Sequence, residues 1–201
     1  SGFSGFSGDN GPATIANMTT PRGIASDNFG NVYIASLSSG NALNNSTIRR
    51  VENGIISTIA GDPLEFFPYE DGVPGTESRV NGANGVAVDD TGNIYIVESA
   101  GNRIRKITPD GIITTFAGDG TPGDAGDGGP AQFLRLDEPQ DIAFDPAGRL
   151  YVSDSGNDRI IAIDLETELA QTVAGSGSMG SSGDQGNALD FSLSEPGGLV
   201  V

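Results

Sequence analysis

The sequence predicts an all-β protein assembled from copies of one four-stranded unit. The first observation is an internal repeat, because PRGIASDNFGNVYIAS at 21–36 returns as ANGVAVDDTGNIYIVES at 83–99 and as PQDIAFDPAGRLYVSDS at 139–155. The second is a regular period, since the Ala-Gly pair that begins at Ala60 returns twice, 57 residues later each time. The third is the content of turn-forming residues, with 31 glycines and 11 prolines among 201 residues. Self-similarity at a fixed period is typical of repeat architectures.

Each repeat contains four short apolar runs separated by turn residues. In the second repeat the runs are GVAVD, NIYIVE, RIRKI and IITTFAG, which are rich in Val, Ile and Thr and therefore predict strands. The stretches DDTGN and TPDG between them are typical of hairpin connections. GVAV and IYIV are almost continuously apolar, so we expect them to be buried on both faces, whereas the alternation in RIRKI predicts a half-exposed strand.

Four antiparallel strands with a buried inner pair are typical of one blade of a β-propeller. The sequence therefore predicts a β-propeller segment of three four-stranded antiparallel blades plus the first strand of a fourth, in one region over residues 1–201. The repeats cover about 21–82, 83–138 and 139–194, and the partial repeat covers 195–201. Three blades do not close a ring. We expect the end faces to be covered by further blades of a longer chain, by a second chain, or by neighbours in a fibre.

Composition excludes several functions. The net charge is −17, from 27 acidic and 10 basic residues, and the basic residues form no cluster. We therefore expect no binding to nucleic acid. The absence of histidine and cysteine removes Ser-His-Asp triads, cysteine nucleophiles, disulfides and zinc sites with His or Cys ligands. No apolar run of membrane-spanning length is present, so no membrane insertion is expected.

Longer stretches of the chain match a known pattern. AGNRIRKITPDGIITTFAGDGTPGDAGDGGPA, followed by EPQDIAFDPAGRLYVSDSGNDRI, resembles NHL-repeat β-propellers in their longer-repeat form, with about 57 residues per blade. The resemblance covers the whole chain and is weakest in the first repeat, where SLSSGNALNNSTIRRV carries an insertion. It implies a propeller, commonly with six blades. Such proteins are mostly scaffolds for protein, RNA or glycan contacts, and a few related propellers are metal-dependent enzymes.

The stretch AGDGTPGDAGDGGPA at 117–131 has counterparts in every repeat. The structural interpretation is that glycine supplies positive φ, aspartate accepts backbone N–H groups, and Pro130 starts a helical turn at AQFL. The functional alternative is calcium, with Asp119, Asp124 and Asp127 as oxygen ligands. The loop contains no basic residue, which disfavours phosphate. No other cofactor and no catalytic residue is predicted.

Acidic side chains recur at two further places. Asp27, Asp89 and Asp145 close the first strand of their repeats, and we expect them to accept hydrogen bonds from their own turns; the alternative is a ring of carboxylates around a channel. Acid–arginine pairs follow the second strand, as Glu98 with Arg103 and Asp154 with Arg159. A pair repeated in each blade predicts a structural bridge. The alternative is a contact with a partner on the binding face.

Two features indicate a surface that meets other molecules. Asn17, Asn44 and Asn45 begin N-glycosylation sequons, which predict N-linked glycans and an extracellular or cell-surface location. Aromatic side chains cluster in DPLEFFPYEDG, where they predict either a partner-binding patch or a local plug over a blade edge. The members of this aromatic cluster are Phe66, Phe67 and Tyr69.

These observations together predict a non-enzymatic extracellular interaction or structural module built from NHL-type repeats. Acidity, sequons and uncovered blades favour a component of a glycosylated surface assembly or fibre, whose partners are other protein subunits or additional propeller blades. The alternative is part of a metal-dependent propeller hydrolase or lyase whose metal ligands belong to other blades.

Overall fold

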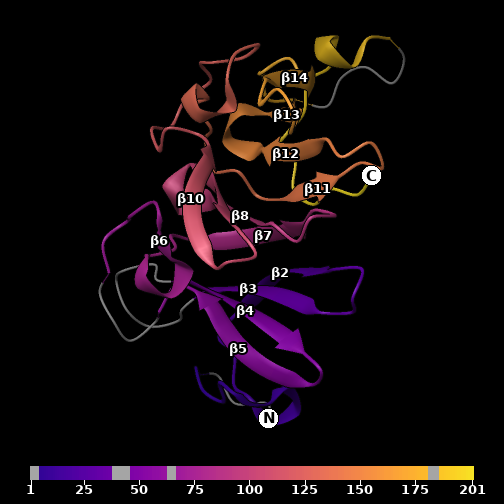
Figure 1. The fold of residues 1–201 in the computed structure, drawn as a ribbon. Coiled ribbons are helices and arrows are strands. Elements are labelled where there is room, and N and C mark those ends of the chain that lie inside the picture. The colour runs from indigo at the N-terminus through magenta and orange to yellow at the C-terminus, as the bar shows by residue number, and fades with distance from the viewer. Residues whose placement is uncertain (1–4, 38–45, 63–66, 181–185) are drawn as a thin grey trace. The chain divides into compact units, whose positions relative to one another are not determined.

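The computed structural model describes residues 5–37, 46–62, 67–180 and 186–201. It consists of three antiparallel sheets joined by loops and single 3-10 turns, which confirms the predicted all-β class (Figure 1). The chain divides into two compact units, residues 1–96 with 105–114, and residues 97–104 with 115–201.

The first sheet has five strands in the order β1-β5-β4-β3-β2. The four predicted strands are present, and each pairs with the one before it in the chain. A two-residue strand, β1, adds a fifth member at the outer edge by pairing Gly11 with Ile56. The bounds are β1 Gly11–Pro12, β2 Pro21–Ser26, β3 Val32–Leu37, β4 Ser46–Glu52 and β5 Ile55–Ala60.

The second and third sheets repeat this plan. The second sheet has the order β6-β10-β9-β8-β7, with a two-residue β6 at its outer edge. The third sheet has the order β11-β12-β13-β14, and an isolated bridge between Pro130 and Leu169 takes the place of the edge strand. The bounds are β6 Val73–Pro74, β7 Ala83–Val88, β8 Ile94–Glu98, β9 Arg103–Ile107, β10 Ile112–Ala117, β11 Ile142–Phe144, β12 Leu150–Asp154, β13 Arg159–Ile163 and β14 Ala170–Ala174.

The final residues differ from the expectation. Residues 195–201, predicted as the first strand of a fourth blade, form no strand in the structure. A strand needs a neighbour that shares its ladder of backbone hydrogen bonds. The N–H of Leu199 instead donates to Asp141 Oδ2 at 2.9 Å.

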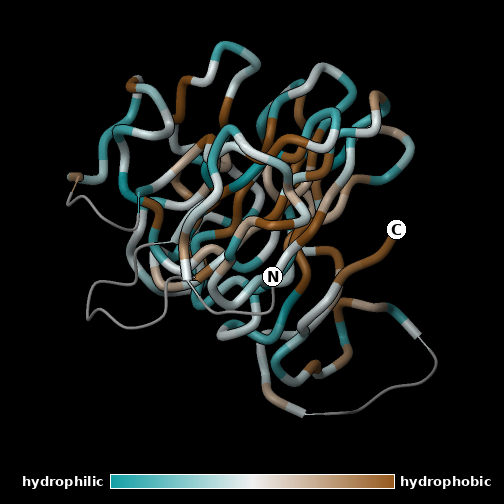
Figure 2. The backbone as a smooth tube through the Cα atoms, turned by 90° about the horizontal axis from the view of Figure 1, so that it is seen from below, coloured by the Kyte–Doolittle hydropathy of each residue, from teal (hydrophilic) through white to brown (hydrophobic). Residues whose placement is uncertain are grey.

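The core of the first unit lies between the first and second sheets. β2 can approach β7 because residue 23 is glycine; a Cβ there would lie 2.4 Å from the carbonyl oxygen of Asn84. Figure 2 shows that hydrophobic and hydrophilic stretches alternate along the backbone. The buried members of this core are Tyr33, Ala35, Ile48, Ala60, Val80, Ala83, Val86, Ile94, Ile96, Ile107 and Ile113.

Burial of the inner strands is confirmed for one sheet and is wrong for another. Every residue of β8 is buried, as its continuous apolar run predicts. In β2, by contrast, Ile24 is 72% exposed, whereas Val86 at the equivalent position of β7 is only 4% exposed. The reason lies in the alternation of side chains along a strand. Gly23 faces β7, so its neighbour Ile24 points to the opposite face, where no described sheet covers it.

Candidate functional site

The connecting segments, residues 7–13, 70–76 and 126–131, precede the sheets in sequence, and the second and third of them tie adjacent sheets together. Gly75 shows how, because its N–H donates to the carbonyl of Gly111 in the second sheet (2.9 Å). Its own carbonyl accepts the N–H of Gly61, which follows the last strand of the first sheet (3.0 Å). One residue therefore joins the outer edges of two sheets through both of its backbone groups.

Ala131 makes the corresponding pair of bonds in the next connecting segment. Its N–H donates to Glu168 (2.8 Å) and its carbonyl accepts from Gly118 (3.0 Å). A 3-10 turn over Ala131–Phe133 starts directly after Pro130, as the structural interpretation of this loop predicted. The recurring glycine- and aspartate-rich loop thus joins neighbouring sheets through backbone hydrogen bonds, and we call this loop with its hydrogen bonds a clasp.

At two of the connecting segments, a fully buried arginine from a neighbouring strand binds the loop, and the sequence analysis missed both of these arginines. Arg105 Nη2 donates to Asp71 Oδ1 (2.9 Å) and to the carbonyl of Glu70 (2.8 Å), and Arg49 pairs in the same way with Asp9. The expectation that RIRKI is a half-exposed strand is therefore wrong for Arg105. A guanidinium tolerates burial here because a carboxylate and a carbonyl accept hydrogen bonds from its Nη2 group. The signal in the sequence was only the recurrence of both residue types in consecutive repeats, an arginine in the third apolar run and an aspartate in the loop.

The third sheet has Ile161 where the first two have the buried arginine. The loop aspartate at this place, Asp127, has a different set of partners. It accepts the backbone N–H of Thr172 (2.6 Å) and the hydroxyl of the same residue (3.0 Å). The loop is thus still bonded to the third sheet, but the ion pair between a buried arginine and the loop aspartate is absent there.

The acid–arginine pairs predicted after the second strand are present. Arg103 Nε donates to Glu98 at 2.6 Å, and Arg159 Nε donates to Asp154 at 2.8 Å. Both carboxylates are fully buried. Burial raises the pKa of Asp154, and hydrogen bonds from its neighbours, Arg159 among them, oppose that rise. This geometry supports the structural alternative, because a partner cannot reach the carboxylates; a contact role for these four residues stays a prediction.

The three aspartates considered for calcium do not converge. Asp119 accepts the N–H of Thr121 (2.7 Å), which is the main reason that its pKa is lowered, and it also pairs with Arg135. Asp127 is bound to Thr172, as described above. In the part of the chain that the structure describes, no three acidic side chains gather closely enough to hold a metal ion. Calcium binding stays a prediction without an assembled ligand set.

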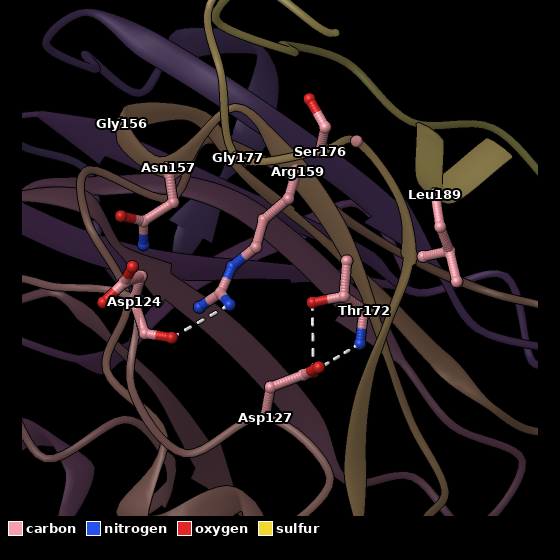
Figure 3. Close-up of a pocket in the computed structure, with 10 residues that line it drawn as sticks. Asp124, Asp127, Gly156, Asn157, Arg159, Thr172, Ser176, Gly177 and Leu189 are labelled. Carbon is pink, nitrogen blue, oxygen red and sulfur yellow. Dashed lines mark hydrogen bonds between the residues drawn. The ribbon is translucent and has the colours of Figure 1, made fainter. Parts of the chain in front are cut away.

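Asp124 and Asp127 instead line a cavity of about 360 Å³ beside the third sheet (Figure 3). The guanidinium of Arg159 points toward the loop and donates to the carbonyl of Asp124 at 3.1 Å. Asp127 faces Thr172 on the other side. Asn157 and Arg159 also donate to residues behind the lining, so these polar groups already have hydrogen-bond partners within the protein.

The turn aspartates hold their own turns, as predicted. Asp89 Oδ1 accepts the N–H groups of Thr91 and Asn93, both at 2.9 Å, and its other oxygen accepts the hydroxyl of Tyr95. Burial alone would raise the pKa of Asp89, but the hydrogen bonds from Asn93 and Thr91 outweigh it and lower the pKa. Asp27 and Asp145 make the same set of bonds.

Half of the predicted surface residues can be placed. Asn44, Asn45 and Phe66 lie outside the described residues.

Asn17 is partly exposed, and its amide donates to Ser7 Oγ at 3.1 Å. Phe67 is half buried, while Tyr69 is exposed with the guanidinium of Arg79 stacked 4.8 Å from its ring centre. Glycosylation and partner binding at these positions stay predictions. No helix among the described residues has the length and apolar character needed to cross a membrane.

Comparison with known proteins gives matches to two family models. The model described as NHL repeat matches residues 136–162, and the model described as Beta-propeller repeat matches residues 14–44. Teneurin-3 from Danio rerio is 32% identical over 140 residues, which cover 60% of this chain and 5% of that protein. NHL repeat-containing protein 3 from Homo sapiens is 40% identical over 84 residues, which cover 40% of this chain and 21% of that protein. The chain thus matches only a small part of either relative.

Solved structures share the fold. A Bacteroides thetaiotaomicron protein of unknown function superimposes with a TM-score of 0.62 at 20% sequence identity, over 88% of this chain and 41% of that one. A chain of the nidogen/laminin complex superimposes with a TM-score of 0.50 at 21% identity, over 77% of this chain and 48% of that one. The solved structures thus agree with the fold, and the matched repeat models and relatives show that the chain is similar to NHL-repeat β-propellers.

Proposed function

We propose that this chain is a non-enzymatic extracellular module that binds other proteins through its blade surfaces. The observation that carries the proposal is the uncovered face of the first blade. Ile24 is 72% exposed there, although its counterpart Val86 is packed between two blades. Burying an isoleucine side chain is worth roughly 1.5–3 kcal/mol. The face therefore has the chemistry of a blade-to-blade contact and is suited to a further blade or to another subunit.

The extracellular assignment has separate support. Teneurin-3 is similar to 60% of this chain, and three N-glycosylation sequons occur in the sequence. We propose that the chain is a component of a glycosylated surface assembly, either a closed ring of blades or a fibre. This role is consistent with these observations and with the uncovered face. Its partners would be other subunits or additional blades.

The proposal is tested by placing a charge on the uncovered face. The chain is secreted from eukaryotic cells as the Ile24→Lys variant and, as a matched control, as the Ile55→Lys variant, which alters an exposed isoleucine on the outer strand β5. Sedimentation velocity and negative-stain electron microscopy then report the assembly state. We expect the parent chain and Ile55→Lys to form rings or filaments and Ile24→Lys to remain monomeric. A parent chain that stays monomeric and carries no glycan would overturn the proposal.

A further inference from the structure

A second apolar feature lies away from the uncovered face, at the turn between β2 and β3. Phe29 occupies the tip of this turn and is 89% exposed. The turn itself does not require an aromatic residue, because Thr91 and Ala147 occupy the same position in the next two blades. Phe29 is therefore an exposed aromatic residue that the turn itself does not call for, and its importance depends on what lies beside it.

The turn holds Phe29 in a fixed place. Asp27 Oδ1 accepts the N–H groups of Phe29 and Asn31, both at 2.9 Å, and Asp27 Oδ2 accepts the hydroxyl of Tyr33 at 3.0 Å. These bonds lower the pKa of Asp27 against the effect of its burial, so the carboxylate remains charged at neutral pH. A side chain on so constrained a turn loses little conformational entropy when it binds a partner.

Phe29 stands at the rim of a groove of about 260 Å³. The groove lies between the first and second blades, entirely within the first compact unit. Its lining includes four apolar side chains from these blades, namely Ile59, Ile94, Ile107 and Pro109. Residues of two turns, Thr91–Gly92 and Thr108–Gly111, also line it. Both blades that form the groove are present, so its apolar wall is not a surface awaiting a neighbouring blade.

The charges near the groove are mainly negative. Exposed Asp90 and Asp110 lie on the two turns that border it, and Asn28 donates to Asp90 at 3.2 Å. Arg50 is the only basic residue in the lining, and it is already paired with exposed Glu52 at 3.1 Å. The whole chain adds to this field with a net charge of −17. An acidic rim around an apolar slot favours cationic groups that flank an apolar side chain.

We propose that this groove receives a basic peptide segment of a partner protein, with one leucine-sized anchor side chain beside Phe29 and lysine or arginine on either side of the anchor. The anchor fills the space between the blades, and the flanking cations lie against Asp90, Asp110 and the face of the Phe29 ring. The inference deepens the proposed function, because it names one surface and one class of partner for the interaction module.

The test uses three synthetic nonapeptides and the full chain labelled at its isoleucine methyl groups. The first peptide is Gly-Ser-Lys-Arg-Leu-Arg-Lys-Ser-Gly; the second replaces Leu with Gly, and the third replaces all four basic residues with Glu. We expect only the first peptide to shift the methyl resonances of Ile59, Ile94 and Ile107 in a saturable way, with no shift at Ile161 of the third blade. Binding should weaken as salt is raised, because the rim charges are exposed.

Two variants locate the contact. Phe29→Ala should weaken binding of the first peptide about tenfold, as expected for an aromatic anchor. Phe133→Ala removes another phenylalanine that is 64% exposed, and it should leave binding unchanged. Thermal unfolding of both variants should match that of the parent chain, which separates a lost contact from a lost fold.

Three results would overturn the inference. The first is equal binding of the acidic or anchorless peptide, and the second is an unchanged affinity in Phe29→Ala. The third is a loss of self-association in Phe29→Ala, which would make a second copy of this chain the occupant. Because Ile24 takes no part in the groove, the outcome is independent of the assembly test. Peptide binding can fail while rings or filaments persist, and assembly can fail while the peptide still binds.

Discussion

Among single residues, Arg105 is the one whose burial demands most from its surroundings. Its side chain is fully buried, while that of Asp71 is 51% exposed. An unpaired charge in this position would be very costly, and the bonds to Asp71 and to the carbonyl of Glu70 offset that cost. Arg105 therefore fixes the connecting segment to the blade, because breaking its bonds to that segment would leave a buried charge unpaired.

Replacing Arg105 with methionine tests this role at nearly constant volume. We expect Arg105→Met to lower the free energy of unfolding by about 1–3 kcal/mol, because the carbonyl of Glu70 and the carboxylate of Asp71 lose their partner. Urea unfolding followed by circular dichroism measures the change.

Arg135→Met is the matched control for this substitution. Arg135 and Asp119 form a partly exposed pair at 3.4 Å, which should be worth at most about 1 kcal/mol. Equal losses in the two variants would mean that the buried pair carries no special weight.

The two kinds of ion pair also differ in how visible they are in the sequence. Glu98 and Arg103 lie five residues apart, so their recurrence as Asp154 and Arg159 makes the pair easy to recognise in the sequence. Asp71 and Arg105 lie 34 residues apart and belong to different elements. The alternation of RIRKI then points Arg105 to solvent. Only the path of the connecting segment, which no local pattern encodes, brings the carboxylate over it.

Among the structural elements, the connecting segments show where strand prediction stops. The longer strands were predictable because four to seven β-forming residues stand between turn signals. β1 and β6 contain two residues each, too few for any alternation to appear. Each nevertheless covers the outer edge of a sheet, where unpaired backbone groups would otherwise face water.

Gly118, at the end of β10, gives a test of how tightly the clasp is packed. Its φ is +86°, and a Cβ at this residue would lie 2.6 Å from the carbonyl oxygen of Asn102. We expect Gly118→Ala to destabilise the protein by roughly 1–3 kcal/mol, since strain and a backbone clash add together. Differential scanning calorimetry measures the effect.

Gly111→Ala separates the two causes. Gly111 has a φ of +82° but open space around the added methyl group, so only the conformational cost of about 1 kcal/mol applies. The packing argument fails if the two alanine variants unfold at the same temperature.

For the molecule as a whole, the predicted repeat gave the number and order of the sheets correctly, because every copy has the same turn residues and the same apolar runs. Exposure did not follow from the repeat. Equivalent residues in a repeat array have different neighbours, as Ile24 and Val86 demonstrate, so a local pattern cannot tell an end blade from a middle one. Phe29 is missed for a related reason: the turn tolerates many residues at that position.

Hydrogen exchange measures this difference between equivalent strands. β2 and β7 both lie at the inner edge of their sheets. The face of β7 that carries Val86 packs against the first blade, whereas the equivalent face of β2, which carries Ile24, is covered by none of the described residues. We expect amides of β7 to exchange at least about tenfold more slowly than those of β2, a difference of ~1.4 kcal/mol in local opening. Equal protection in the monomeric chain would contradict the assigned burial.

The double attachment of Gly75 has a practical consequence for anyone who dissects this protein. A fragment cut at the visible start of the second sheet, Ala83, would leave behind the dipeptide that seals β10. The bare edge would then recruit other chains and favour aggregation. A fragment that begins upstream of Val73 carries its own seal. The self-sufficient unit of this architecture is therefore offset from the sheet, and it starts in what the sequence presents as a loop.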